Sequence, residues 1–180
     1  MRNAVANGNV VLVGPMGSGK SHVGRLLAAR LGLAFADVDA HIEAEAGMPI
    51  PAIFASEGEA GFRARESRVL ADRLQRQGQV IATGGGAVLD AGNRAAIRGA
   101  AHVVYLHVEL TEQLRRLAGN TGRPLLDAVN RAQRLAELQA HREPLYREVA
   151  DLVFETSGLP PENVAAALAT SIAPDQEHPP

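Results

Sequence analysis

Residues 14–21, GPMGSGKS, combine glycines, a lysine and a hydroxyl at a spacing that can hold phosphate. They fit the P-loop pattern G-x-x-x-x-G-K-[ST], and they lie between an apolar run and a helical pattern, as that loop requires. Glycines let successive backbone N–H groups turn toward a phosphate, and the positive end of the following helix adds to the attraction. The motif therefore predicts a site for a nucleoside triphosphate.

Two side chains of this motif have predicted roles of their own. Lys20 is expected to reach the β and γ phosphates, and the Ser21 hydroxyl is expected to ligate Mg²⁺. Lys20 is the only lysine in the sequence, and the remaining Lys and Arg residues, of 18 in all, are arginines. Because a guanidinium is a wide planar group and an ammonium a compact charge, we expect that position 20 excludes arginine. Further nucleotide contacts are expected from Gly14, Met16, Gly17, Ser18, Gly19 and His22.

A pair of carboxylates follows in FADVD, where Asp37 and Asp39 are two residues apart. We expect this stretch to be a strand over 34–39, so both side chains would share one face. Two carboxylates so close repel each other unless a cation or a substrate hydroxyl lies between them. The pair is therefore predicted to face such a group, whereas Glu109, after a later apolar run, is interpreted as solvent-exposed.

Three consecutive glycines, Gly84, Gly85 and Gly86, follow the apolar run at 80–83. Glycine is favoured where another group must approach the backbone closely. Ligands of parallel α/β proteins bind beyond the carboxyl ends of the strands, and the P-loop, the aspartates and the glycines all follow predicted strands. We expect the glycines to face an acceptor substrate, with its atoms close to their backbone N–H groups.

Short apolar runs alternate with helical patterns along the chain, which predicts an α/β fold with a parallel sheet and helices on both faces. The expected strands are 10–13, 34–39, 80–83, 102–108 and 152–155. The expected helices are 20–31, 40–46, 51–56, 59–77, 91–98, one that begins with Thr111 as its N-cap, and 162–172.

Length and composition limit the possible classes of protein. A chain of 180 residues suits one domain, with a core over about 9–172 and disordered ends. A net charge of −2 and an aromatic content of 3% argue against a nucleic-acid binder. The sequence lacks an apolar run of membrane-spanning length and the apolar core of a signal peptide, so we expect a cytoplasmic protein. The absence of cysteine and the spacing of the histidines predict no transition-metal site.

Six segments in order resemble shikimate kinase: GPMGSGKS, FADVDAHIE, FR at 62–63, TGGGAV, GNTGRPLL at 119–126 and HREPLYREVA at 141–150. The resemblance covers the chain from about Val10 to the last helix, and its specificity lies in the joint order and spacing. It implies a P-loop three-layer sandwich with a five-stranded parallel sheet in the order 2-3-1-4-5. It also implies a substrate-binding region over about 38–66 and a mobile lid over about 117–128.

The resemblance further implies phosphorylation of shikimate to shikimate 3-phosphate, with ATP and Mg²⁺. Short loops and the lack of an obvious exposed apolar helix face favour a monomer. Asp39 would bind the hydroxyls of shikimate, Arg63 and Arg142 its carboxylate, and Gly85 would add backbone contacts. Two arginines suit a carboxylate, because charge-assisted hydrogen bonds to it are strong. Read without the family, Arg63 could instead pair with Glu66 one helical turn on, and Arg142 could be a solvated charge at a helix end.

On the nucleotide side, the resemblance implies that Arg123 closes over the phosphates from the lid. Asp37 would hold Mg²⁺ through water, and Arg115 and Pro161 would flank the adenine. His22 stands where the family commonly has threonine, and Ser21 retains the metal role.

Two alternative functions stay open at this point. One is another small-metabolite P-loop kinase, such as a gluconate kinase; a nucleotide kinase is disfavoured because few aromatic residues are present to hold a second base. The other is a nucleotide-dependent switch without catalysis, because a P-loop alone does not choose between these classes.

Overall fold

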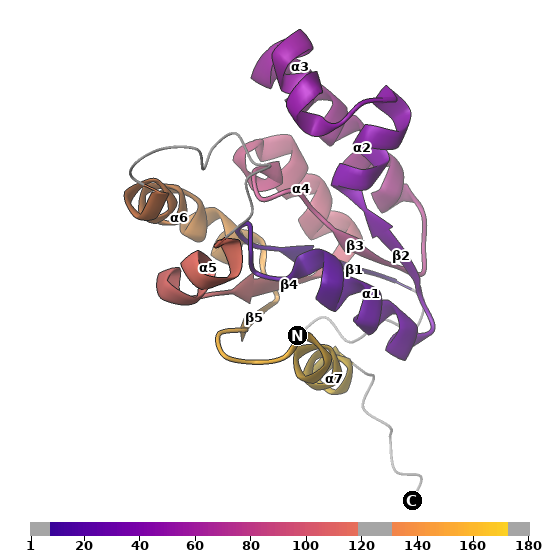
Figure 1. Cartoon of the computed structure of the whole chain (residues 1–180). Helices are drawn as coiled ribbons and strands as arrows, with labels where there is room; N and C mark the ends of the chain where they lie inside the picture. Colours follow the sequence, from indigo (N-terminus) through magenta and orange to yellow (C-terminus); the bar gives the residue numbers. More distant parts are fainter. Residues whose placement is uncertain (1–7, 119–130, 173–180) are drawn as a thin grey trace, which may run out of the picture.

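The computed structural model describes residues 8–118 and 131–172, and five parallel strands form one sheet in this part of the chain. The order is β2-β3-β1-β4-β5, which confirms the predicted topology (Figure 1). The central strand pairs on both sides, with Val10 opposite Val80 and His102. The strands are β1 (Asn9–Val13), β2 (Ala34–Asp37), β3 (Gln79–Ala82), β4 (Ala101–His107) and β5 (Leu152–Glu155).

Helices cover both faces of the sheet, as expected from its apolar strands. The helices are α1 (Lys20–Leu31), α2 (Val38–Ala46), α3 (Ile50–Gln75), α4 (Ala91–Ala100), α5 (Leu110–Leu117), α6 (Arg131–Val149) and α7 (Pro161–Ile172), with a 3₁₀ turn η1 (Ala87–Leu89). Within the described ranges, no helix is both long enough and apolar enough to cross a membrane.

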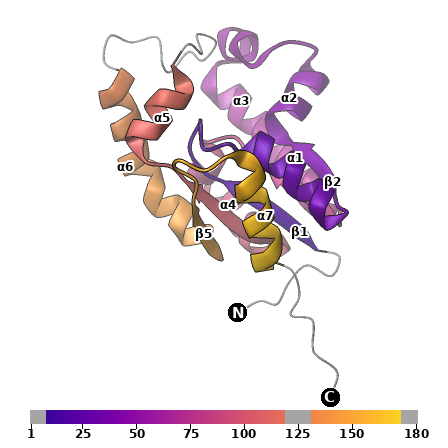
Figure 2. The same cartoon turned by 60° about the horizontal axis from the view of Figure 1, so that its bottom comes forward.

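Alternate residues of β1 enter two separate cores. Val10 and Leu12 pack with residues of α1 and α7, which lie side by side on one face (Figure 2). Val11 and Val13 pack with residues of α2, α3, α4 and α6 on the other face. Because successive side chains of a strand point to opposite sides, a fully apolar strand must be covered on both.

The second strand ends two residues earlier than expected. β2 stops at Asp37, whose carboxylate accepts the N–H of Ala40 at 3.3 Å and thereby caps α2. Aspartate is among the favoured N-cap residues because its side chain satisfies an N–H group that the helix leaves unpaired. The prediction that Asp37 and Asp39 share a strand face is therefore wrong, since Asp39 lies in the first turn of α2.

Other boundaries also differ from the sequence predictions. The helices expected at 51–56 and 59–77 form one element, α3, which is kinked at Gly58, where φ is 72°. α5 begins after Glu109, whose N–H donates to Ser157 Oγ at 2.9 Å, so the proposed cap at Thr111 is wrong. α6 was not predicted, and it contains Pro144, a residue that normally argues against a helix interior.

Candidate functional site

The P-loop connects β1 to α1 and has the backbone that its glycines predict. Gly14, Gly17 and Gly19 have φ angles of 144°, 79° and 93°, which residues with a Cβ rarely adopt. Lys20 is the first residue of α1, and its side chain turns back over the loop. Its Nζ donates to the carbonyls of Gly14 and Pro15, each at 2.8 Å. The lone lysine is therefore held at the loop, close to where a phosphate would bind.

Ser21 and Asp37 come together from α1 and the end of β2. The Ser21 hydroxyl donates to Asp37 Oδ2 at 2.5 Å. Hydroxyl and carboxylate oxygens suit a hard cation such as Mg²⁺, which usually keeps several waters and takes few protein ligands. Among the residues that the structure describes, no group of three or more His, Asp or Glu side chains could hold a metal ion.

A cavity of about 470 Å³, here named the P-loop cavity, opens beside α1 and α7. Five of the residues predicted to contact nucleotide line it, from three separate parts of the chain. They are Ser18, Gly19, His22, Arg115 and Pro161. The cavity also includes Arg116 and Thr156, which the sequence analysis did not single out.

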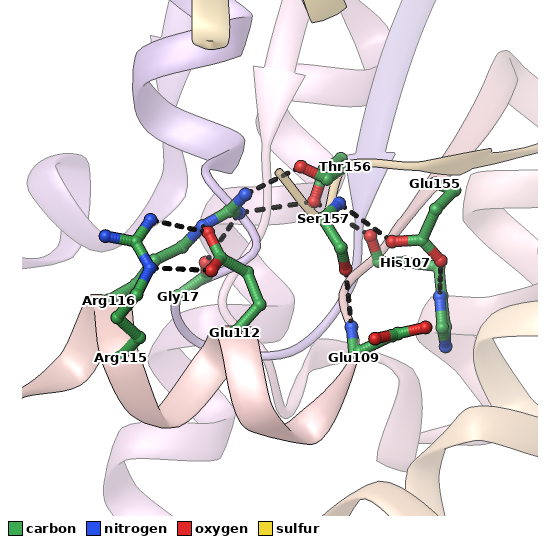
Figure 3. A network of polar contacts seen from close by, with 9 residues as sticks. All are labelled: Gly17, His107, Glu109, Glu112, Arg115, Arg116, Glu155, Thr156 and Ser157. Carbon is green, nitrogen blue, oxygen red and sulfur yellow. Dashed lines mark hydrogen bonds and ion pairs between the residues drawn. The ribbon is translucent and has the colours of Figure 1, made fainter. Parts of the chain in front are cut away.

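Arg116 joins the P-loop to the segment that follows β5 (Figure 3). Its guanidinium donates to the carbonyl of Gly17 at 3.2 Å and to the Thr156 carbonyl at 2.6 Å. Only 21% of its side chain is exposed, against 74% for Arg115. Arg116 is therefore the more buried of the two arginines that line the P-loop cavity. The sequence signal was the adjacent pair Arg115 and Arg116, of which only Arg115 was predicted to contact nucleotide.

Glu112 accepts hydrogen bonds from both arginines, at 2.7 Å from Arg115 Nε and 2.7 Å from Arg116 Nε (Figure 3). These bonds lower the pKa of the Glu112 carboxyl to about 2. One turn of α5 also contributes Gln113, whose Nε2 donates to the Met16 carbonyl at 2.8 Å. Together with Arg116, this helix supports the P-loop at two consecutive carbonyls.

A second cavity of about 360 Å³, here named the acceptor cavity, lies between α2, α3, α6 and the glycine run. Its lining includes Met16 of the P-loop, so that loop contributes to both cavities. Every residue predicted to contact the acceptor lines it: Asp39, Arg63, Gly84, Gly85, Gly86 and Arg142. The remaining lining residues are Glu43, Ile50, Pro51, Phe54, Phe62 and Glu66.

Both predicted carboxylate-binding arginines line this cavity, and their environments differ. Arg142 is 8% exposed, which excludes the interpretation as a solvated charge at a helix end. Arg63 Nη1 lies 2.6 Å from Glu66 Oε2, so the helical pairing considered as an alternative is present as well. This ion pair belongs to the acceptor cavity, because Arg63 and Glu66 both line it.

Glu66 is a site residue that the sequence analysis treated only as a partner for Arg63. Its side chain is 1% exposed, and burial raises the pKa of its carboxyl. Its second oxygen, Oε1, is buried and has no hydrogen-bond partner among the described residues. The signal in the sequence was its place one helical turn after Arg63, which puts both side chains on the same face of α3.

The glycine run makes room mainly for side chains of the protein itself. A Cβ on Gly84 would lie 2.5 Å from Glu66 Oε1 and 2.9 Å from Asp39 Oδ1, and one on Gly86 would overlap the Arg63 guanidinium. A Cβ on Gly85 would meet only ordinary contacts, with Met16 N at 3.5 Å the nearest. None of the three has a positive φ. Protein side chains therefore account for the close approach at Gly84 and Gly86, and the expectation that the run also faces an acceptor stays a prediction.

One predicted residue has no described position. Arg123 lies outside the described residues, as does most of the predicted lid segment 117–128. The other predicted residues line one of the two cavities or belong to the P-loop, except Asp37, which lies at the end of β2 beside Ser21. Asp37 turns toward Ser21, whereas Asp39 turns toward Gly84 and the acceptor cavity.

Known proteins resemble this chain in sequence and in structure. The family model described as Shikimate kinase matches residues 16–173. A shikimate kinase of Stenotrophomonas maltophilia is 50% identical over 165 residues, which cover 92% of each chain. One from Pseudomonas aeruginosa is 53% identical over 156 residues, which cover 87% of this chain and 91% of the other.

Among solved structures, the shikimate kinase of Acinetobacter baumannii in complex with shikimate has a TM-score of 0.90 and 44% identity. The match covers 93% of each chain. The family match over most of the sequence, the relatives at half identity and the shared five-stranded fold agree with one another, and the chain belongs to the shikimate kinase family.

Proposed function

We propose that this chain transfers the γ-phosphate of ATP to shikimate, giving shikimate 3-phosphate, and that the two cavities hold the two substrates. The observation that carries the proposal is the arrangement of a P-loop between a nucleotide-sized cavity and a second cavity that contains two arginines. The relative solved with shikimate, which is 44% identical over 93% of this chain, supports the choice of acceptor.

On the donor side, the phosphates of ATP lie in the P-loop and the adenine lies in the P-loop cavity. Pro161 and the arginine pair Arg115 and Arg116 form the walls on either side of the base. Lys20 moves from the carbonyls of Gly14 and Pro15, where its Nζ lies at 2.8 Å, to the β and γ phosphates. This change exchanges two neutral acceptors for charged ones, which bind an ammonium more strongly.

Ser21 and Asp37 are the residues that would hold Mg²⁺, Ser21 directly and Asp37 through water. Their oxygens already lie 2.5 Å apart, so the Ser21 hydroxyl needs only to turn its proton away from Asp37. The ion, when bound with ATP, neutralises charge on the transferring phosphate. Arg123 is proposed to add a further positive charge there from the lid.

On the acceptor side, Arg63 and Arg142 bind the carboxylate of shikimate, and Asp39 binds its hydroxyls. Asp39 orients the attacking hydroxyl toward the P-loop, and its carboxylate accepts the proton of that hydroxyl. The backbone of the glycine run completes this wall of the cavity. Phosphoryl transfer of this kind depends on positioning and electrostatic stabilisation more than on covalent chemistry.

The test compares acceptors and two arginine variants in one coupled assay of ADP release. Shikimate, its methyl ester and gluconate are supplied with Mg²⁺ and ATP, and NMR identifies the phosphorylated oxygen. Hydrogen bonds to charged groups contribute roughly 1.5–3 kcal/mol each, so the ester should lose at least about 10²-fold in kcat/KM. Arg142→Ala should lose activity on shikimate and discriminate less against the ester.

Arg68→Ala is the matched control, because Arg68 lies on the same helix as Arg63 with a 60% exposed side chain. Equal rates with acid and ester would refute the carboxylate site, and faster turnover of gluconate would favour the alternative kinase. A protein that binds ATP without stimulated ADP release would favour the non-catalytic switch. That the chain acts as a cytoplasmic monomer stays a prediction from the sequence.

A further inference from the structure

Tyr146 connects α6 to the glycine run. The residue is 1% exposed, and its hydroxyl donates to the carbonyl of Gly85 at 2.5 Å. One turn earlier on the same helix, Arg142 places Nη1 3.7 Å from the Cβ position of Gly85. A single helix therefore contributes an arginine to the acceptor cavity and fixes a backbone group at its edge.

The three glycine carbonyls are held in two different ways. Gly84 O accepts the N–H of Ala87 at 3.2 Å, and Gly86 O accepts the N–H of Leu89 at 3.0 Å. These are local bonds of the turn η1, whereas the Gly85 carbonyl is held by a side chain 61 residues away. Because glycine adopts both signs of φ with similar ease, a peptide group within this run can rotate when its carbonyl is released.

The Gly85 carbonyl also determines the direction of an N–H group. In a trans peptide, the C=O and the following N–H point in opposite directions, and the described residues contain no cis peptide bond. The bond from Tyr146 therefore fixes the N–H of Gly86 on the side away from α6. Gly86 lines the acceptor cavity, and Gly85 lies 3.5 Å, measured from its Cβ position, from Met16 N of the P-loop.

We propose that Tyr146 is a positioning residue for the acceptor, because its hydroxyl holds the Gly85–Gly86 peptide with the Gly86 N–H directed toward bound shikimate. The proposal rests on the proposed function, since shikimate is the ligand that this N–H would meet. Burial raises the pKa of the Tyr146 hydroxyl to about 12, so the group stays a hydrogen-bond donor at neutral pH.

The neighbouring Tyr105 offers a matched control. Its ring stacks on Tyr146 with the centroids 5.1 Å apart. Its hydroxyl is also buried but has no hydrogen-bond partner among the described residues. Tyr146→Phe and Tyr105→Phe each remove one oxygen from the same stacked pair. Only the first releases the Gly85 carbonyl, and it also removes a hydroxyl that interacts with the Arg142 side chain.

The experiment measures KM for shikimate and for ATP in both variants and in the wild type. Tyr146→Phe should raise KM for shikimate about tenfold, the effect of an unpaired buried carbonyl and a misdirected N–H. KM for ATP should stay within about twofold, and Tyr105→Phe should leave both constants within about twofold. An unchanged KM for shikimate in Tyr146→Phe, an equal rise in KM for ATP, or the same effect in both variants would overturn the proposal.

A merely structural role for Tyr146 would lower Tm without moving KM for shikimate, and that result also counts against the proposal. The wild type tests the proposed function in the same assay, because it must first turn over shikimate. A second measurement uses only the wild-type protein, so it does not depend on whether Tyr146→Phe folds. In wild-type protein labelled with ¹⁵N-glycine, saturating shikimate should shift the Gly86 amide resonance strongly and that of Gly92, on α4, little. A Gly86 resonance that does not move would overturn the proposal.

Discussion

Replacing Gly86 with alanine should displace Arg63 rather than strain the backbone. Gly86 has φ of −99°, a value that alanine adopts freely. Its added Cβ would lie 2.7 Å from Cζ of Arg63, with two guanidinium nitrogens closer still. Carbon atoms in contact normally stay about 3.5–4.0 Å apart. The guanidinium, at the end of a flexible side chain, must therefore move.

The size of the effect follows from what Arg63 would lose. The displaced guanidinium gives up its 2.6 Å bond to Glu66 and its place against the carboxylate of the acceptor. Hydrogen bonds to charged groups contribute about 1.5–3 kcal/mol, which corresponds to roughly 10- to 150-fold in an equilibrium constant. We therefore expect Gly86→Ala to raise KM for shikimate by about that range, with KM for ATP within about twofold.

A double-mutant cycle separates this mechanism from a general disturbance of the loop. Wild type, Gly86→Ala, Arg63→Ala and the double variant are compared for KM with shikimate and for Tm. If alanine acts by displacing Arg63, the second substitution should add little to the first, because interacting residues are strongly non-additive. Gly99→Ala is the control, since a Cβ on that α4 residue meets nothing within 4 Å. Additive effects at positions 86 and 63 would refute the reasoning.

Two further predictions concern the nucleotide side. Lys20→Ala should lower kcat by about 10²-fold or more, as removal of one charge-stabilising donor does. Lys20→Arg should have a similar effect, because the ammonium fits between two carbonyls at 2.8 Å where a guanidinium does not. Near-normal turnover by Lys20→Arg would contradict this. Glu112 has a folded-state pKa of about 2, below its ordinary 4.5, so its contribution to stability is present above pH 4.5 and is lost as the pH falls toward 2. The difference in Tm between wild type and Glu112→Gln should therefore close over that range, and a difference that widened in acid would contradict the ion pairs with Arg115 and Arg116.

The sequence by itself determined the fold class and the P-loop. Fully apolar strands require cover on both faces. The P-loop, the aspartates and the glycines were placed near one another because each occurs at the carboxyl end of a predicted parallel strand. Those signals are local, since a strand, a glycine-rich turn and a helix start can each be recognised within about ten residues. Six residues of the acceptor cavity were also predicted, through the order of several motifs rather than through any one of them, whereas Glu66 was not recognised as a site residue.

Only the tertiary structure decided how the two aspartates divide their roles. A period of two places Asp37 and Asp39 on one face, but helix capping at Asp37 ends the strand. Asp37 then pairs with Ser21, whereas Asp39 lines the acceptor cavity. The extent of helix α6 was not predicted either; it continues through Pro144, whose cost inside a helix must be offset by packing that a sequence pattern does not contain.

The glycine run shows most clearly that long-range contacts cannot be read from the local sequence. Its lack of side chains predicted a close approach, but the groups that approach are Glu66, Asp39 and Arg63, which lie between 18 and 45 residues before the glycines they contact. The bond from Tyr146 to Gly85 joins residues 61 positions apart. Such contacts depend on how α2, α3 and α6 pack against the sheet, and packing at that range is fixed by the whole core rather than by the local sequence.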